Sequence, residues 1–344
     1  MPKILVTGGT GYIGSHTVVE LLKEGMQVVI IDNLCNSERK VLDGIFSITG
    51  KMPDFEEVDL KDQEATFRVF EKHPDIEAII HFAAYKAVGE SVEKPLEYYE
   101  NNLLSLIHLL KAMKHFPVDH MVFSSSCTVY GEPDELPVTE NAPIKKAGSP
   151  YGNTKQISEE ILQDTVHAVQ GLGVISLRYF NPIGAHPSAL IGELPIGVPN
   201  NLVPFITQTA AGIRDCLSVF GDDYNTPDGS AIRDYINVVD LALAHVSAIK
   251  RLIDQKQKSA FEVFNLGTGS GLSVFEVIKA FERSTGQALN YKVVGRREGD
   301  IEKVWADTSY ANSELGWKAE KGIEESLRSA WKWEMQIRSK NKQG

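Results

Sequence analysis

Short apolar runs alternate with helical hydrophobic patterns through the first half of the chain, and this alternation constrains the fold most. In the segments between the runs, for instance 96–114 and 151–170, apolar residues recur three and four positions apart. The runs are KILVT (3–7), QVVIID (27–32), AIIHFA (78–83), HMVFSSS (120–126) and VISLRYF (174–180). Strands that alternate with helices predict an α/β fold with a doubly wound parallel sheet, covered by helices on both faces.

The chain changes character after residue 180. Residues 181–235 are rich in Pro, Gly and Asn but carry interspersed apolar residues, which indicates an irregular insertion and not a linker. The next stretch returns to a strand–helix–strand pattern, and the tail from residue 272 has two or three helical patterns. We predict that 1–180 and 236–266 form the sheet domain, and that 181–235 and 267–344 form a smaller, C-terminal substrate-binding domain.

Composition excludes several classes of protein. No apolar run approaches the ~18 residues that a membrane span needs, and glycines come too early in MPKILVTGG for a signal peptide. Cys35, Cys127 and Cys216 stand far apart, which argues against a disulfide framework and a zinc site. The net charge is −11 and no basic stripe is visible, which argues against nucleic acid. We expect a cytoplasmic protein without a metal, a membrane partner or a nucleic-acid partner.

A glycine-rich loop, VTGGTGYIG (6–14), joins the first strand to the first helix. Gly8, Gly11 and Gly14 let backbone amides approach a pyrophosphate at the helix N-terminus. The loop alone could be a plain strand-to-helix turn, but Asp32 ends the second strand about 20 residues on, as a dinucleotide site requires. An acid there binds ribose hydroxyls and repels a 2′-phosphate, so we predict a Rossmann-type site for NAD and not NADP. Asp59 either contacts the adenine or remains a solvated loop acid.

The segment SPYGNTK places Tyr151 and Lys155 on one face of a helix, and Pro150 suits the start of that helix. The Lys155 ammonium is expected to favour the Tyr151 phenolate, turning a phenol of pKa ~10 into a usable base. A surface tyrosine beside a salt-bridged lysine is the alternative. The nearby segment SSSCTVYG (124–131) ends a strand on hydroxyls, where a doubly wound sheet presents its ligands. Together the two segments favour proton-transfer chemistry at the sheet edge.

Nine segments in a fixed order carry a resemblance to a known family over residues 1 to about 320. They are TGGTGYIG, DNLCNS, HFAAYKAVGES, SSSCTVYG, SPYGNTK, RYFNPIGAHPS, VPNNLVP, DGSAIRDYI and RREGD. Together they resemble the UDP-glucose 4-epimerases, which are extended short-chain dehydrogenases/reductases. The resemblance implies a homodimeric isomerase that interconverts UDP-galactose and UDP-glucose. In this reaction the sugar passes hydride from C4 to NAD+ and becomes a transient 4-keto sugar. This intermediate rotates in the site and takes hydride back on its other face.

The resemblance also implies roles for individual residues. Tyr151 would be the acid/base, Lys155 would tune it and hold the nicotinamide ribose, and Ser126 would hydrogen-bond the reacting oxygen. These three catalytic residues would also contact the cofactor. The other implied cofactor-binding residues are Gly8, Gly11, Tyr12, Ile13, Gly14, Asp32, Asn33, Leu34, Cys35, Asn36, Ser37, Asp59, Leu60, Phe82, Ala83, Ala84, Lys86, Asn101 and Phe180.

Ser126 and Tyr151 would contact the UDP-sugar as well. The other implied substrate-binding residues are Asn181, Asn201, Leu202, Leu217, Phe220, Arg233, Tyr235, Arg297, Asp300 and Val304. Residue chemistry agrees for Arg233 and Arg297, because a diphosphate needs cations and this acidic chain must supply them locally. A solvated or ion-paired arginine is the alternative for each.

Val304 bears on which sugars fit. Family members with a bulky aromatic residue at this place resemble enzymes restricted to UDP-glucose and UDP-galactose, whereas members with a small residue also admit 2-acetamido sugars. We therefore expect UDP-N-acetylglucosamine and UDP-N-acetylgalactosamine to be accepted as well. The alternative is that Val304 packs under a loop and another side chain closes the pocket.

Two other functions compete with epimerisation. Sugar-nucleotide dehydratases and decarboxylases of the same superfamily resemble this chain, but they carry acids where Cys127 and Thr128 stand here. A non-catalytic NAD-binding sensor would typically lose the tyrosine or the lysine, and both Tyr151 and Lys155 are present. The sequence therefore favours the epimerase over both alternatives.

Overall fold

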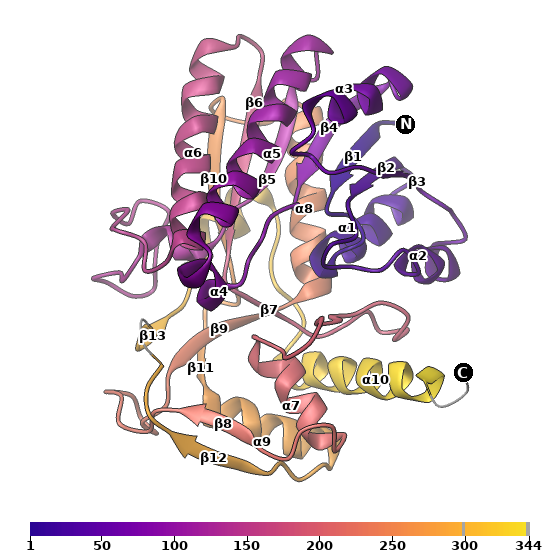
Figure 1. The fold of residues 1–344 in the computed structure, drawn as a ribbon. Helices are drawn as coiled ribbons and strands as arrows, with labels where there is room; N and C mark the ends of the chain where they lie inside the picture. Colours follow the sequence, from indigo (N-terminus) through magenta and orange to yellow (C-terminus); the bar gives the residue numbers. More distant parts are fainter. Residues whose placement is uncertain (298–299, 342–344) are drawn as a thin grey trace.

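The computed structural model of the protein describes residues 1–297 and 300–341. Glu298 and Gly299 of the RREGD segment, and residues 342–344, lie outside the described part. A parallel sheet of seven strands, in the order β10-β6-β5-β4-β1-β2-β3, forms the larger part of the molecule (Figure 1). Its strands are β1 (Lys3–Thr7), β2 (Gln27–Asp32), β3 (Asp54–Glu57), β4 (Ile76–His81), β5 (His120–Ser124), β6 (Gly173–Tyr179) and β10 (Phe261–Leu266). The predicted doubly wound α/β fold is confirmed.

Helices cover both faces of this sheet because the strands are apolar on both sides. Along β1, Ile4 and Val6 belong to one buried cluster and Leu5 to another. The first cluster also takes side chains from α1 (Tyr12–Lys23), α2 (Val41–Thr49) and α8 (Val238–Ile253). The second takes them from α3 (Gln63–Lys72), α5 (Pro95–His115) and α6 (Pro150–Ala168). A short helix, α4 (Val88–Glu93), precedes α5.

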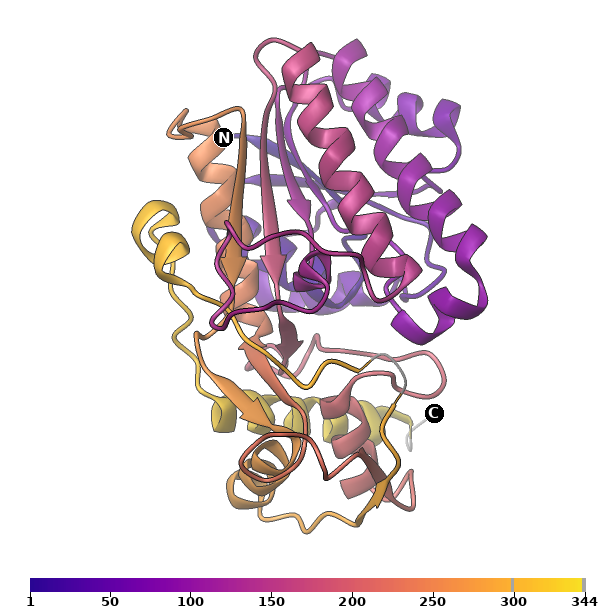
Figure 2. The same ribbon diagram turned by 90° about the vertical axis from the view of Figure 1, so that its left-hand side faces the viewer.

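The smaller part lies beyond one end of the sheet (Figures 1 and 2). It contains a sheet of four short strands and a separate strand pair, β8 (Leu217–Phe220) with β12 (Tyr291–Val294). The four strands are β7 (Asn181–Ile183), β9 (Ile232–Asn237), β11 (Gly271–Ser273) and β13 (Lys303–Val304). Its helices are α7 (Leu202–Ala210), α9 (Val274–Thr285) and α10 (Ile323–Asn341). Short turns of 3-10 and π helix lie at Cys127–Tyr130 and Ala311–Leu315.

Two details differ from the sequence-based expectation. Residues 181–235 are more regular than expected, since they hold β7, α7, β8 and the beginning of β9. The strand that opens the strand–helix–strand pattern after residue 230 is β9, and it pairs with β7 and β11 in the small sheet and not with the central one. Apolar content alone could not show this, because pairing depends on partners far away in sequence.

The helix that carries Tyr151 begins as its sequence indicates. Ser149 precedes the helix with an extended backbone, and its hydroxyl accepts a hydrogen bond from the Gly152 amide at 3.2 Å. Pro150 occupies the first helical position, where its missing N–H costs nothing. These two residues therefore set where Tyr151 and Lys155 lie along the sheet edge.

Within the described residues, no helix combines the length and the apolar character that crossing a membrane requires. No three or more His, Cys, Asp or Glu side chains converge there as a metal site would require.

Candidate active site

The predicted catalytic residues and most of the predicted cofactor residues lie where the carboxyl ends of β1, β2, β4, β5 and β6 face the smaller part of the molecule (Figure 1). This is the edge at which open parallel sheets bind ligands, because the strands end there and the following loops diverge. The glycine loop follows β1, and the 33–37 loop follows β2. Residues 82–86 follow β4, the serine segment follows β5, and Phe180 follows β6.

Packing requires glycine at two positions of the glycine loop and favours it less strongly at a third. Gly8 has φ +68°, and a Cβ there would lie 2.9 Å from the Ala83 amide nitrogen. A Cβ at Gly14 would lie 2.2 Å from the Gly8 carbonyl oxygen. At Gly11 the nearest atom would be that same oxygen, at 3.1 Å, and no other atom lies within 4 Å. Gly11 stands at the start of α1, which has no side-chain cap, so the open side of this loop can admit an anionic group.

Asp32 organises the loop that follows β2. One carboxylate oxygen accepts hydrogen bonds from the Leu34 amide at 2.9 Å and the Ser37 hydroxyl at 3.1 Å, and the other accepts one from the Thr10 amide at 3.2 Å. The Ser37 hydroxyl also bonds the Thr10 hydroxyl at 2.7 Å. The carboxylate therefore ties the glycine loop to the 33–37 loop, and Leu34 adopts φ +58° within it.

Asp59 and Leu60, which follow β3, lie next to the 33–37 loop, which contains Cys35. Asp59 accepts a hydrogen bond from the Lys61 amide at 2.9 Å, and its side chain remains 42% exposed. Leu60 is buried in the core beneath it. Burial raises the pKa of the Cys35 thiol, and the carboxylates of Asp32 and Asp59 add to this effect. Cys35 is therefore a neutral thiol at physiological pH.

The segment after β4 is held by a residue that sequence reasoning missed. Asn102 accepts a hydrogen bond from the Tyr85 amide at 2.8 Å and donates to the Tyr85 carbonyl at 3.0 Å. It also donates to the Thr154 hydroxyl at 3.0 Å and accepts from Asn101 at 3.1 Å. Asn102 thus links the segment that carries Lys86 to the helix that carries Tyr151. Two adjacent asparagines in a helix, NN at 101–102, were the only sequence signal for it.

Tyr151 and Ser126 lie together at the sheet edge. Tyr151 is only 8% exposed. Ser126 begins the short turn of 3-10 helix after β5, and the Ser126 hydroxyl accepts a hydrogen bond from the Thr128 amide at 3.2 Å. Burial raises the pKa of Tyr151 well above the ordinary value for tyrosine, although hydrogen bonding to Ser126 acts in the opposite direction. Tyr179 lies close by, with its hydroxyl 2.7 Å from the Ser124 hydroxyl.

Lys155 is bound by a backbone carbonyl at the end of β5. Its ammonium donates to the Ser124 carbonyl at 2.7 Å and lies 4.8 Å from the centre of the Phe123 ring. Burial lowers the pKa of Lys155 to about 8, while Glu159 opposes that shift. That Lys155 favours the Tyr151 phenolate stays a prediction, because in the protein alone the ammonium binds a backbone carbonyl and burial dominates the pKa of the Tyr151 phenol. A further positive charge nearby would favour ionisation of Tyr151.

Four of the predicted substrate residues lie in the small sheet, which faces this edge. Asn181 of β7 is paired with Tyr235 of β9, and Val304 of β13 is paired with Arg233 of β9. Arg233 donates to the Asp300 carboxylate at 2.5 Å and to the Ile232 carbonyl at 2.8 Å. The short strands thus bring together residues that lie up to 123 positions apart in the sequence, from Asn181 to Val304.

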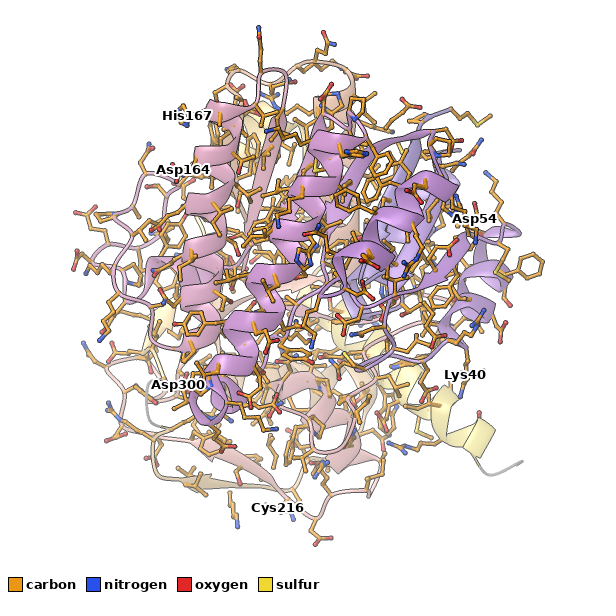
Figure 3. All side chains as sticks on the ribbon, turned by 45° about the horizontal axis from the view of Figure 1, so that its top comes forward. Lys40, Asp54, Asp164, His167, Cys216 and Asp300 are labelled. Atoms are coloured by element: carbon orange, nitrogen blue, oxygen red, sulfur yellow. The ribbon has the colours of Figure 1, made fainter. Side chains whose placement is uncertain are left out.

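The remaining predicted substrate residues are more dispersed. Arg297 is exposed, and its guanidinium lies 4.5 Å from the centre of the Phe220 ring. Leu217 is buried in the core of the smaller part and does not present its side chain to the surface. Asp300 lies at the level where the two parts meet, while Cys216, beside Leu217, lies at the far end of the smaller part (Figure 3). Leu202 begins α7.

Glu193 is a second residue that sequence reasoning missed. Its carboxylate accepts a hydrogen bond from the Asn201 side chain at 2.6 Å and lies 3.6 Å from the Lys86 ammonium. It therefore connects a predicted cofactor residue to a predicted substrate residue. Its backbone carbonyl accepts a hydrogen bond from the Trp333 ring at 2.8 Å. No motif in GELP points to this position, because the contact is made by folding alone.

Comparisons with known proteins agree with this geometry. The family model described as GDP-mannose 4,6 dehydratase matches residues 5–330. The chain is 50% identical to a UDP-glucose 4-epimerase of Haemophilus influenzae over 331 residues, covering 96% of this chain and 97% of the relative. It is 51% identical to a UDP-glucose 4-epimerase of Bacillus subtilis over 331 residues, covering 96% of each. The chain belongs to the UDP-glucose 4-epimerase family.

Solved structures of UDP-glucose 4-epimerases share the fold as well. The enzyme of Stenotrophomonas maltophila, crystallised with NAD and formylated UDP-arabinopyranose, superposes with a TM-score of 0.95 at 48% identity and covers 99% of this chain and 100% of that one. The enzyme of Bifidobacterium longum, in complex with NAD+ and UDP, gives a TM-score of 0.93 at 47% identity, covering 98% and 99%. The sequence-based assignment to this isomerase family is confirmed.

In this member of the UDP-glucose 4-epimerase family, Val304 is packed in the interior next to the short turn of 3-10 helix after β5. It is 5% exposed and belongs to a small apolar cluster with Val129, Tyr130 and Phe180, against which Cys127 also packs. Burial raises the pKa of Cys127 to about 12, so the thiol is neutral. Position 127, next to Ser126, therefore carries no acid. The resemblance implies that dehydratases of the superfamily do carry acids here.

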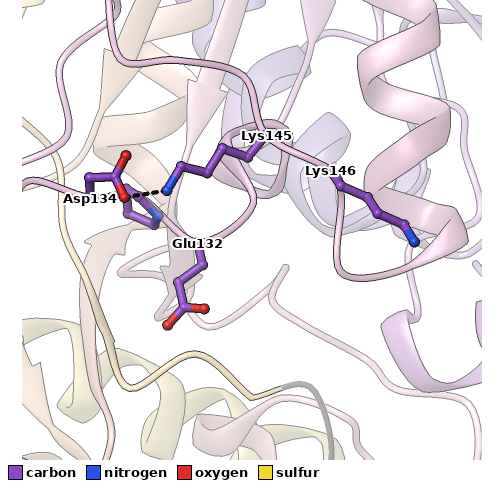
Figure 4. A pocket seen from close by; sticks show the side chains of 5 residues that line it. Glu132, Asp134, Lys145 and Lys146 are labelled. Atoms are coloured by element: carbon purple, nitrogen blue, oxygen red, sulfur yellow. Dashed lines mark hydrogen bonds and ion pairs between the residues drawn. The ribbon is translucent and has the colours of Figure 1, made fainter.

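A surface depression borders the loop that leads to Tyr151 (Figure 4). It is lined by Glu132, Pro133, Asp134, Lys145 and Lys146, and Lys145 forms an ion pair with Asp134. The depression holds this ion pair, while the Lys146 side chain points away from both acids (Figure 4). It lies outside the group of predicted site residues, and we assign it no role in the reaction.

Proposed function

We propose that the protein is an NAD-dependent isomerase that interconverts UDP-galactose and UDP-glucose through a transient 4-keto sugar. The observation that carries this proposal is the position of Tyr151. Its buried hydroxyl lies beside Ser126, at the sheet edge between a dinucleotide-type glycine loop and a small sheet that presents Arg233. A proton acceptor, a cofactor loop and a cation for a diphosphate thus face one another.

The chain's residues fit NAD. The open side of Gly11 and the uncapped start of α1 suit a pyrophosphate, because unpaired backbone amides there favour negative charge. Asp32 at the end of β2 suits the hydroxyls of the adenosine ribose and repels a 2′-phosphate. Lys86 would meet the pyrophosphate, and Phe180 would pack beside the nicotinamide. Related UDP-glucose 4-epimerases have been crystallised with NAD, which supports the same choice here.

Bound NAD supplies hydride acceptance and return at C4 of the sugar, and its oxidised nicotinamide brings a positive charge. This charge is what Tyr151 lacks in the protein alone, where burial raises the pKa of its phenol. Tyr151 then takes the proton from the 4-hydroxyl group and gives it back. Ser126 holds the reacting oxygen at the correct distance, and Lys155 adds its charge from the adjacent turn of α6. The proton therefore moves within one buried group of side chains.

The smaller part holds the UDP. Arg233 is paired with Asp300 in this structure, so a diphosphate that binds Arg233 must compete with that carboxylate. Arg297 is exposed on the rim and can add a second cation. Most of the predicted anchors therefore belong to UDP and few to the hexose. A firmly held nucleotide and a loosely held sugar are what a 4-keto sugar needs in order to present its other face.

Turnover and cofactor content test this proposal together. Purified protein is expected to convert UDP-galactose to UDP-glucose without added oxidant, because the sugar returns to its original oxidation level. Denaturing the protein is expected to release NAD. Protein that releases NADP, or that carries no nucleotide and remains inactive when NAD is supplied, would sink the assignment of Asp32 and the reaction with it.

We also propose that UDP-N-acetylglucosamine and UDP-N-acetylgalactosamine are substrates. Val304 is smaller than tyrosine by most of a ring, and it packs in one buried apolar cluster with Tyr130 and Phe180, the residue predicted to lie beside the nicotinamide. An N-acetyl group pressed against a bulky residue there would cost about 1–3 kcal/mol, by analogy with overpacking. A related UDP-Glc/GlcNAc 4-epimerase, that of Campylobacter jejuni, shares the fold with a TM-score of 0.83 at 36% identity.

The variant Val304→Tyr tests this specificity. We expect it to lose turnover of the acetylated pair while keeping that of UDP-galactose and UDP-glucose, which serves as the internal control. If wild-type protein does not turn over the acetylated sugars, or if the variant still does, the size of residue 304 does not determine which sugars are accepted.

The family resemblance further supports a cytoplasmic homodimer as the working form. Val88, Val92 and Leu96, on α4 and at the start of α5, are 50%, 62% and 77% exposed, and such apolar surface favours contact with another chain. Sedimentation at micromolar concentration is expected to give twice the mass of one chain, and a single-chain mass would refute the dimer.

A further inference from the structure

A buried carboxylate that none of the assigned roles uses lies one helical turn beyond Lys155. Glu159 of α6 is 4% exposed. One of its oxygens accepts hydrogen bonds from the Ser125 hydroxyl at 2.6 Å and the Ser176 hydroxyl at 2.7 Å. Arg178 donates to both oxygens, through Nε at 3.0 and 3.2 Å and through Nη2 at 2.5 Å. This one side chain therefore joins α6, β6 and the segment after β5.

The network surrounds the turn that carries Ser126. Ser125 directly precedes Ser126, and Ser124 before it supplies the carbonyl that holds the Lys155 ammonium. On the other side of the turn, Arg178 donates to the Tyr130 hydroxyl at 2.9 Å, which in turn donates to Asn265 at 2.7 Å. Both ends of the turn, residues 125 and 130, are thus tied to the Glu159–Arg178 pair.

Stability alone is a weak reason to bury such a pair. Removing two charges from water costs several kcal/mol per ion, and apolar residues of similar volume often serve packing equally well. The arrangement here adds two serine donors that fill the lone pairs of Glu159, and one of them is adjacent to a catalytic residue. Directed hydrogen bonds of this kind set the position of a segment more sharply than apolar packing does.

We propose that Glu159 is a positioning residue for the epimerase reaction, holding the Ser126 turn and Lys155 in register with Tyr151. The proposal rests on the proposed function. Glu159 acts on Ser126 through Ser125, and on Lys155 through its place on the same face of α6, one turn away. Its carboxylate does not touch the reacting atoms.

Charge is the second route by which Glu159 acts on Lys155. Lys155 interacts electrostatically with His81 from β4 and Glu159 from α6. Tyr151 lies one turn away on α6, Tyr179 from β6 bonds the Ser124 hydroxyl, and Arg178 from β6 is paired with Glu159. Burial lowers the pKa of His81 to about 3 and raises the pKa of Tyr179 to about 12, so both are neutral near pH 7. Burial also keeps Tyr151 neutral in the protein alone. Glu159 and Arg178 are the charges that remain, and Glu159 is the nearer influence on Lys155.

Two serines offer a matched test of positioning. Ser125 and Ser176 are both fully buried and both donate to the same oxygen of Glu159, but only Ser125 adjoins Ser126. We expect Ser125→Ala to lower kcat by about ten- to hundredfold, with the KM for UDP-galactose nearly unchanged, because small misplacements of reacting groups carry such costs. Ser176→Ala is expected to keep kcat within about threefold at a similar loss of thermal stability. Equal kcat values for the two variants would overturn the positioning role.

The pH profile tests the charge. Glu159→Gln keeps an acceptor for the serines but removes the negative charge, so Lys155 loses its proton more easily. The pH at which kcat falls on the alkaline side of its pH profile, called the alkaline limb, is expected to decrease by about one unit. Glu159→Asp keeps the negative charge and is expected to leave the limb near its wild-type position. A shift in Glu159→Gln alone therefore cannot come from lost stability, which both variants share. An unmoved limb in Glu159→Gln would overturn the proposal, and since wild-type turnover is measured in the same series, failure of the proposed reaction would be seen separately.

Discussion

The two parts of the molecule present their functional residues in different ways. In the sheet part, each group of residues comes from one short stretch that directly follows a strand, as Asp32 follows β2 and Ser126 follows β5. In the smaller part, Asn181, Arg233 and Val304 come from three distant stretches that meet only in a sheet of two- to six-residue strands. In the sheet part, functional residues therefore lie close together in the sequence. In the smaller part, the site forms only when strands from distant stretches of sequence pair.

This difference separates the roles as well. Proton transfer needs groups held within hydrogen-bond reach, and a helix and strand of the sheet part provide such rigidity. Nucleotide recognition can use long, adjustable arginines on short strands and loops. Variants in the sheet part are thus expected to affect kcat, and variants in the smaller part are expected to affect KM.

Tyr151→Phe is the sharpest test of the sheet part, because it removes the proton acceptor and keeps the ring. We expect turnover to fall by about 10² to 10⁴, the usual range for loss of a general acid–base group. The affinity for UDP, measured by calorimetry, is expected to remain. Turnover near that of wild type would show that another group takes the proton.

Arg233→Met is the corresponding test of the smaller part. A hydrogen-bonded charge pair to a phosphate contributes about 1.5–3 kcal/mol, so we expect the KM for UDP-galactose to rise by about ten- to hundredfold. The kcat is expected to change far less. A variant that loses kcat and keeps KM would break the proposed division between the two parts.

Acid is expected to act on the sheet part first. Burial lowers the pKa of His16 and His81 to about 3 and that of His245 to about 4, and all three lie on helices or strands of that part. The unfolded chain takes up these protons near pH 6.5 and the folded chain does not, so stability falls as pH drops from 6.5 toward 3. At pH 5 each histidine is expected to cost about 2 kcal/mol of unfolding free energy.

Denaturant unfolding at pH 7 and pH 5 measures this effect. His245→Leu is expected to reduce the loss of unfolding free energy between pH 7 and pH 5 by the contribution of one histidine, about 2 kcal/mol. If the variant keeps the full loss between pH 7 and pH 5, His245 is already charged in the folded protein and the expected cause is wrong.

The smallest effect on turnover is expected at the start of α9 in the smaller part. Ser273 forms a capping box there: its hydroxyl accepts from the Glu276 amide, and the Glu276 side chain accepts from the Ser273 amide. The same hydroxyl donates to the Asp228 carboxylate. Ser273→Ala loses both interactions and is expected to lower the unfolding free energy by about 2–4 kcal/mol. Turnover should stay the same at 25 °C. A large loss of turnover would mean that this helix contributes to the site more directly than its position suggests.

Much of the sheet part could be predicted from sequence. KILVT matches β1, and the helical pattern at 96–114 matches α5 to within one residue at each end. Such agreement is possible because burial on both faces makes strands apolar throughout and gives helices a clear period. The order of the nine segments identified the family and, through it, the group of residues around Tyr151.

What could not be predicted depends on contacts between distant residues. Helical spacing placed Lys155 on the face of Tyr151, but it could not show that the Ser124 carbonyl binds the ammonium. The pairing of Arg233 with Asp300 spans 67 positions, and strands as short as β13 give no periodic signal. Asn102 and Glu193 connect groups that meet only after folding.

The last long helix determines when the substrate side can form. Leu327 and Trp331 of α10 pack in the same core as Val203 of α7 and Phe281 of α9. During synthesis on the ribosome, that core must wait until residues 323–341 have emerged, whereas β1 to β6 are available much earlier. A nascent chain halted at residue 320 is therefore expected to bind nicotinamide nucleotide but not UDP. Measuring both affinities on stalled ribosomes would reveal whether the enzyme acquires its cofactor before it can recognise a sugar.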